Sequence, residues 1–177
     1  MTGGAKGRTR GQALTEFALV APIFFLLLFA VIQLGIVMAA QNGLVDGVRS
    51  AARRAATYRI NEGSFDATVW PSICTTIKDE VRVRLSTRVI GYNPANLTRT
   101  LTYEWQQNPE SGDYFLVAHV VATYKNQLYV PLISAILDRV DGTVDDKLTL
   151  TASEQMRIEN PALHPSTDPP AAPPACP

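Results

Sequence analysis

The sequence predicts an α+β protein in which a long N-terminal transmembrane helix extends into a small domain with a short antiparallel sheet. Three observations predict this class. Residues 17–40 form an apolar run without a single charged side chain. Apolar residues then recur at helical spacing as far as residue 59. Farther along, runs rich in Val, Thr and aromatic residues are separated by the turn compositions that join strands.

The charge balance limits the classes of partner. The 177 residues carry 16 Lys+Arg and 16 Asp+Glu, which gives a formal net charge of zero. A protein that binds nucleic acid over much of its surface normally has a strong basic excess, so we expect no nucleic-acid partner. The charges are unevenly placed, because Lys6, Arg8 and Arg10 precede the first acidic residue, Glu16. Residues 1–11 are therefore interpreted as a flexible basic leader.

The apolar run is long enough to cross a bilayer. Phe17 to Ala40 are 24 positions, which span about 36 Å as a helix, against a hydrocarbon core of about 30 Å. Within this run, only Pro22, Gln33 and Gly35 lie outside the apolar set. Pro22 lacks a backbone donor, so we expect a local kink or loosening of the helix there.

The helix is predicted to cover residues 12–59, because no proline follows Pro22 until Pro71. Small residues at four-residue steps form a stripe on it, at Gly35, Ala39, Gly43 and Gly47. Such residues let another backbone approach closely. Two interpretations stay open. The stripe seats the protein's own domain, or it packs against helices of other subunits in an assembly, and the two can apply to different stretches.

Residues 60–159 are predicted to form the α+β domain. Its predicted order is a loop at 60–69, a helix at 71–89, a hairpin with strands at 97–106 and 113–125, a helix at 131–140 and a strand at 147–158. Residues 160–177 hold seven of the twelve prolines. Because such a segment cannot form a packed core, we expect a disordered tail.

A hydrophobic N-terminal segment has three ordinary explanations. The first is a cleaved signal peptide, with Val37-Met38-Ala39 as the cleavage site, although the apolar run exceeds the roughly 7–15 residues usual in such peptides. The second is an uncleaved membrane anchor. The third comes from the junction Arg10-Gly11-Gln12-Ala13-Leu14-Thr15-Glu16-Phe17. This junction resembles the type IV prepilin processing site, which is cut after glycine and has glutamate at the fifth mature position.

The chemistry of the junction agrees with this resemblance. Gly11 places no side chain beside the bond to Gln12 and leaves the backbone flexible, as a peptidase requires. A carboxylate at Glu16 is costly beside lipid and needs a partner. The resemblance implies that the partner is the new N-terminal ammonium of a neighbouring subunit. The alternative is a carboxylate that is merely favoured by the positive end of the helix dipole.

Longer motifs resemble the TadE family of tight adherence (Flp) pilus systems. The first is Thr15–Pro22, which includes Phe17 and precedes a Phe/Leu run. The others are the Ala/Arg-rich stretch Val48–Ala56 and the segment Leu148–Glu159. The resemblance covers about residues 12–159 and departs at Gln33–Ile36, where the family often has an acidic residue, Gly and Arg.

The TadE resemblance implies a minor pseudopilin of the bacterial inner membrane with a small, exported pilin-like domain. Its N-terminus would be cytoplasmic. A prepilin peptidase would cut it between Gly11 and Gln12. Its other partners would be membrane lipid, pilin-like subunits and the pilus assembly platform. The rival interpretation is an uncleaved bitopic protein whose outer domain is an interaction module of an envelope secretion or adhesion complex.

The residues indicate no catalytic, metal or cofactor site, so we expect a protein that is not an enzyme. His119 stands in a strand-like run without a nucleophile beside it in the pattern. The acidic residues near Gly142 lack the spacing of a calcium loop and are interpreted as a solvated loop; they are Asp138, Asp141, Asp145 and Asp146. Cys74 and Cys176 can form a disulfide if the domain is exported to an oxidising compartment; otherwise they are free thiols.

Overall fold

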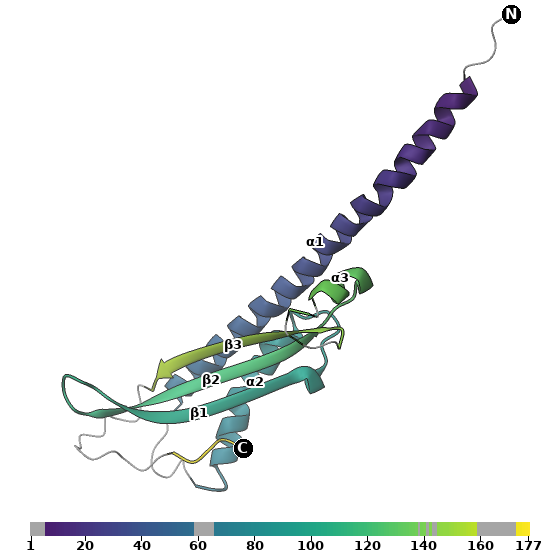
Figure 1. Cartoon of the computed structure of the whole chain (residues 1–177). Coiled ribbons are helices and arrows are strands. Elements are labelled where there is room, and N and C mark those ends of the chain that lie inside the picture. The colour runs from purple at the N-terminus through teal and green to yellow at the C-terminus, as the bar shows by residue number, and fades with distance from the viewer. Residues whose placement is uncertain (1–5, 59–65, 138, 141, 143–144, 159–172) are drawn as a thin grey trace, which may run out of the picture.

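The computed structural model describes residues 6–58, 66–137, 139–140, 142, 145–158 and 173–177. Its elements, in order, are α1 (Lys6–Thr57), α2 (Trp70–Ser86), the 3-10 turn η2 (Pro94–Asn96), β1 (Leu97–Gln107), β2 (Tyr114–Gln127), α3 (Pro131–Leu137) and β3 (Lys147–Arg157). The predicted α+β class, with a long apolar helix and an antiparallel sheet, is confirmed. Figure 1 shows that α1 projects far beyond the rest of the molecule, which gathers around its C-terminal half.

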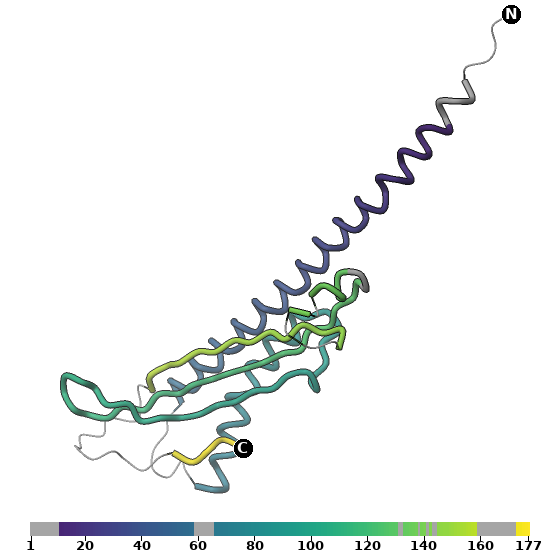
Figure 2. Tube along the Cα trace, viewed as in Figure 1, coloured from purple at the N-terminus to yellow at the C-terminus, as the bar shows by residue number. Residues whose placement is uncertain are grey.

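Helix α1 is longer than predicted at its N-terminal end. It begins at Lys6, so its first turns include part of the segment interpreted as a flexible leader. No proline separates this segment from the apolar run, and helix extension is favourable once a neighbouring turn exists. The helix also continues through Pro22 without interruption, as the tube in Figure 2 shows. The predicted loosening at Pro22 therefore stays a prediction.

Helix α2 packs against the C-terminal half of α1. It begins with Pro71 in its first turn, where proline is tolerated because the first backbone donors have no helical partner. Its buried side chains share one face, and they are Trp70, Ile73, Cys74, Ile77, Val81 and Leu85. The helix ends at Ser86, earlier than the predicted residue 89, and the chain then turns through Gly91 at a φ of +66°.

The sheet is an antiparallel meander in the order β1-β2-β3. Strand β2 is central and pairs with both neighbours, for example at Leu101↔Val120 and Ala122↔Ala152. Helices α1 and α2 cover one face of the sheet (Figure 1). Alternate β1 side chains such as Leu101 and Tyr103 are buried toward these helices. The core thus lies between the helix pair and one sheet face.

An ion pair joins the helical layer to the edge of the sheet. Arg99 on β1 donates a hydrogen bond from Nη1 to Asp79 Oδ1 on α2, at 2.7 Å. The same guanidinium nitrogen donates to the Lys78 carbonyl at 3.0 Å. The hydrogen bond from Arg99 is the main reason that the pKa of Asp79 lies below its ordinary value. The contact therefore holds the start of β1 against the middle of α2.

The C-terminal end differs from the predicted disordered tail. Of residues 160–177, only 173–177 are among the described residues, and they lie against α2. Trp70 Nε1 donates to the Pro174 carbonyl at 3.0 Å, and Lys78 Nζ donates to the Pro177 carbonyl. These contacts depend on side chains of α2, which is distant in sequence, so the composition of the tail alone could not reveal them.

Candidate functional site

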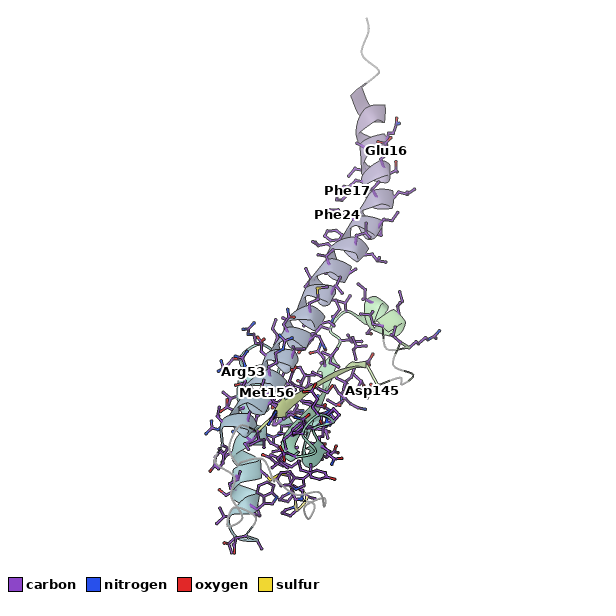
Figure 3. All side chains as sticks on the ribbon, turned by 90° about the vertical axis from the view of Figure 1, so that its left-hand side faces the viewer. Glu16, Phe17, Phe24, Arg53, Asp145 and Met156 are labelled. Carbon is purple, nitrogen blue, oxygen red and sulfur yellow. A yellow bond between two sulfur atoms is a disulfide. The ribbon has the colours of Figure 1, made fainter. Side chains whose placement is uncertain are left out.

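The N-terminal half of α1 has no covering from the domain. Large apolar side chains are exposed along it from Leu14 to Met38, and most of them are more than 40% accessible. Figure 3 shows Glu16, Phe17 and Phe24 on the part of the helix that extends beyond the domain. An exposed apolar surface of this size needs a partner, either lipid or protein. Within the described residues, α1 is the one helix long and apolar enough to cross a membrane.

The junction predicted for processing lies at the start of this exposed half. Gly11 and Gln12 are exposed, and a Cβ at Gly11 would meet no atom within 4 Å. Gln12 Nε2 donates to Glu16 Oε1 at 3.1 Å, and Thr15 Oγ1 donates to the Gln12 carbonyl at 2.8 Å. Among the described residues, Glu16 contacts its own turn and not the domain, so its carboxylate is open to contact by another molecule.

The stripe of small residues is divided between two surroundings. A Cβ on Gly43 would lie 2.8 Å from Arg88 Cβ, and one on Gly47 would lie 3.0 Å from Val81 Cα. These two glycines therefore let α2 approach α1 closely. A Cβ on Gly35 would meet no atom within 4 Å, and Ala39 is exposed. The close approach of α2 thus begins at Gly43, while Gly35 and Ala39 present a small-residue surface outward.

Gln33 is a structural residue that the sequence analysis did not assign. Its side chain is fully buried, and Oε1 accepts hydrogen bonds from the Tyr129 N–H at 2.9 Å and the Val130 N–H at 3.3 Å. It thereby satisfies two backbone donors in the connection from β2 to α3. The available signal was a lone amide in an apolar run, since polar groups are retained there when they have a partner.

These observations describe an exposed apolar half-helix in front of an α+β domain. Residues 11–53 match the TadE-like protein family. The predicted TadE resemblance is confirmed over this part of α1, which runs from the exposed junction to the seat of α2. The match suggests a membrane protein associated with the Tad pilus. No curated protein and no solved structure matches the chain.

The TadE-like segment also contributes to a basic cleft on the outer side of the helix pair. The cleft has a volume of about 360 Å³ and is lined by Asp46, Arg49, Ser50, Arg53, Arg84, Thr87 and Arg88. Arg88 pairs with Asp46 at 3.3 Å, and Arg49 lies 3.7 Å from Glu154 on β3. Four arginines face one acidic side chain here, so the cleft favours an anionic group. Arg49 and Arg53 come from α1, and the packing of α2 against it adds Arg84 and Arg88.

The two cysteines are joined in the structure. Cys74 on α2 and Cys176 form a disulfide with a Cα–Cα distance of 5.6 Å, and the pair is 102 residues apart in sequence. Cys74 is fully buried in the core, and Cys176 packs against that core. The bond anchors the chain end beside the start of α2, at the end of the domain far from the exposed half of α1 (Figure 1).

The remaining chemical candidates are dispersed. His119 lies on β2 opposite Thr102 and Gln155. Of the acidic residues near Gly142, Asp138 and Asp141 lie outside the described residues, Asp145 pairs with Lys125, and Asp146 accepts from Ser134. No group of three potential metal ligands occurs in the described part of the chain. The absence of enzymatic activity stays a prediction.

Proposed function

We propose that this protein is a minor pseudopilin that helps to assemble a tight adherence pilus. The observation that carries the proposal is the exposed half of α1, with Gly11, Gln12 and Glu16 uncovered at its start and apolar side chains beyond them. In a membrane these side chains contact lipid. In an assembly the same surface packs against other pilin-like subunits and the assembly platform. The role is one of assembly, without catalysis by this chain.

The proposed processing step explains the arrangement of the junction. A prepilin peptidase cuts between Gly11 and Gln12 and leaves a positively charged amine on Gln12. The Glu16 carboxylate of a neighbouring subunit then pairs with that amine, which reduces the cost of holding a carboxylate beside apolar surface. Because the peptide bond lies within α1, the first turns must open before cleavage. Gly11 makes this opening easier, since glycine is a weak helix former.

The proposed orientation has the leader in the cytoplasm and the domain exported from the inner membrane. The disulfide between Cys74 and Cys176 supports it, because such bonds persist in oxidising compartments. The basic residues of the leader also suit the cytoplasmic side, although Arg49, Arg53 and Arg54 follow the apolar run 17–40 on the other side. The proposal therefore takes its orientation from the processing motif.

The intact mass of the protein extracted from membranes tests the cleavage. In cells that contain a prepilin peptidase, we expect a mature chain that begins at Gln12. A Gly11→Val variant should stay uncut, because the β-branched side chain stands beside the scissile bond. An Ala13→Val variant is the matched control and should still be cut. Retention of residues 1–11 in the unaltered protein, with active peptidase present, would contradict the pseudopilin proposal.

The second candidate is an uncleaved bitopic protein with an interacting outer domain. The basic cleft lined by Arg49, Arg53, Arg84 and Arg88 favours it, because this surface can bind an acidic partner without any processing. The two candidates differ in one outcome of the same measurement. The bitopic interpretation is supported if residues 1–11 are retained and an Arg53→Glu change alone disrupts the complex with the acidic partner.

A further inference from the structure

A cluster of exposed apolar side chains lies at the end of the domain from which α1 emerges. Outside α1, the described residues include six large apolar side chains that are strongly exposed. Four of them belong to the end of α2 and to the α3 region: Ile90 (64% exposed), Tyr129 (45%), Ile136 (67%) and Val140 (74%). We call these four residues the membrane-proximal patch. The other two, Val69 and Val83, lie on α2 or at its start.

Hydrogen bonds hold this patch at a defined level along α1. The Tyr129 N–H donates to Gln33 Oε1 at 2.9 Å, which fixes the start of the α3 region to α1. Tyr129 Oη donates to the Ile90 carbonyl at 2.8 Å and so joins the chain after α2 to the same region. Figure 1 shows α3 beside α1, at the end of the domain that faces the exposed half of the helix. The patch therefore lies close to the level of Gln33 along α1.

The uncovered length of α1 places this level at the surface of a bilayer. Leu14, which is 70% exposed, and Gln33, which is buried, are separated by 19 residue steps. At about 1.5 Å per step they span about 29 Å, close to the roughly 30 Å of a hydrocarbon core. Sequence alone extends the apolar run to Ala40, about 10 Å farther. Because the domain covers one face of α1 from Gln33 onward, while Leu34 and Met38 on its other faces stay exposed, we place the bilayer surface near the level of Gln33.

We propose that the membrane-proximal patch rests in the outer interface of the bilayer that α1 spans, where it contacts phospholipid. The occupant is lipid because the patch is continuous with the lipid-exposed half of α1 and lies at the depth where the hydrocarbon ends. Apolar and aromatic side chains bind favourably at this boundary. The contact fixes the tilt of the domain relative to the membrane. The inference rests on the membrane anchoring of α1 in the proposed function, and it does not depend on leader cleavage.

Fluorescence quenching by lipid tests this contact. A single cysteine is introduced by Ile136→Cys or Val140→Cys into the full chain and labelled with the environment-sensitive fluorophore NBD, while the native cysteines stay paired. The labelled protein is placed in phosphatidylcholine nanodiscs with or without lipids that carry a doxyl quencher. Ile23→Cys on the exposed half of α1 is the control inside the bilayer. Val69→Cys, at the opposite end of the domain, is the control in water.

We expect doxyl lipid to reduce emission at positions 136 and 140 at least about twofold, as at position 23, and to leave position 69 nearly unchanged. Quenching at position 23 without quenching at 136 and 140 would overturn the proposal while α1 remains a membrane anchor. If the NBD labels at 136 and 140 report a water-shielded environment but are not quenched by doxyl lipid, they contact protein, and this result would also overturn the proposal. Absence of quenching at position 23 would refute the anchoring and the inference together, whatever the mass of the leader shows.

Discussion

At the scale of single residues, two polar side chains of α1 have opposite surroundings. Glu16 is exposed, and its carboxylate accepts a hydrogen bond from Gln12 on the same helix face. Gln33 is buried and accepts hydrogen bonds from two backbone donors of the domain. The first residue is thus available for contact with another molecule, while the second is committed to the fold. Substitutions at the two positions should therefore fail in different ways.

Glu16→Ala should leave the domain folded and processing largely intact, and should strongly reduce pilus assembly. The reason is that only the proposed contact with a neighbouring subunit's amine is lost. Leader cleavage by intact mass and pili by electron microscopy are the measurements. Glu16→Asp is the conservative control and should retain part of the assembly. Normal piliation in the Ala variant would show that the carboxylate has no such role.

Gln33→Leu should lower the stability of the domain by about 1–3 kcal/mol, because the N–H groups of Tyr129 and Val130 lose their acceptor. Amide hydrogen exchange at these two positions should accelerate more than exchange in the centre of β2. Gln33→Glu keeps an acceptor oxygen at the same reach and serves as the control. Unchanged protection of both amides in the Leu variant would mean that the connection from β2 to α3 does not depend on Gln33.

At the scale of elements, the close contact of α1 with α2 determines the shape of the domain. The glycines of the four-residue stripe are alike in sequence, but α2 and the residues just after it pack tightly against Gly43 and Gly47, while a Cβ at Gly35 would meet no atom within 4 Å. The stripe at Gly35 continues into the exposed half. One repeating pattern therefore has two roles, a seat for α2 and a surface that other helices can approach.

Gly47→Val and Gly35→Val separate these roles. The added side chain at position 47 meets the Val81 backbone. We therefore expect Gly47→Val to lower the free energy of unfolding of the domain by about 1–3 kcal/mol. At position 35 the space is open, so thermal unfolding in detergent should keep its midpoint. If Gly35 contacts another helix in the pilus, that variant should instead lose assembly. A Gly35 variant with normal assembly would assign the stripe to the domain alone.

At the scale of the whole molecule, the disulfide ties the chain end to the core. The bond between Cys74 and Cys176 closes a segment that contains the sheet and α3. Trp70 donates to the Pro174 carbonyl beside it, so the last residues cover the start of α2. The domain therefore has two fixed ends, the membrane-proximal end near Gln33 and the disulfide at the opposite end.

Reduction should destabilise the domain by about 2–4 kcal/mol, because the unfolded chain regains the freedom that the crosslink removes. Denaturant unfolding with and without reductant measures this difference, and the fluorescence of Trp70 should change as Pro174 is released. Alkylation should modify two thiols only after reduction. The Cys74→Ser/Cys176→Ser double variant is the control and should not respond to reductant. Two thiols that react without reductant would contradict the bond.

Much of the fold could be predicted from local patterns. The structure agrees with most predicted element ends to within a few residues. This holds for the helices predicted from apolar periodicity, for the hairpin of β1 with β2, and for β3. One exception has a local cause and the other a tertiary cause. Helix α1 begins six residues before the predicted start, and the last five residues pack against α2 instead of being wholly disordered. Neither the length of an uninterrupted helix nor a contact across the domain follows from composition.

The sequence by itself determined that this protein has a charge-free apolar run long enough to span a membrane, a processing-like junction at Gly11 and a TadE-like continuation. Those features are local, because they depend on runs and spacings along one helix. Only the tertiary structure decided which glycines contact α2 and that Gln33 is buried, and the contact of the domain with the bilayer at that level is our proposal. The physical reason is that burial and hydrogen bonding depend on residues from distant segments, here the β2–α3 connection and α2, whose approach to α1 no spacing within α1 encodes.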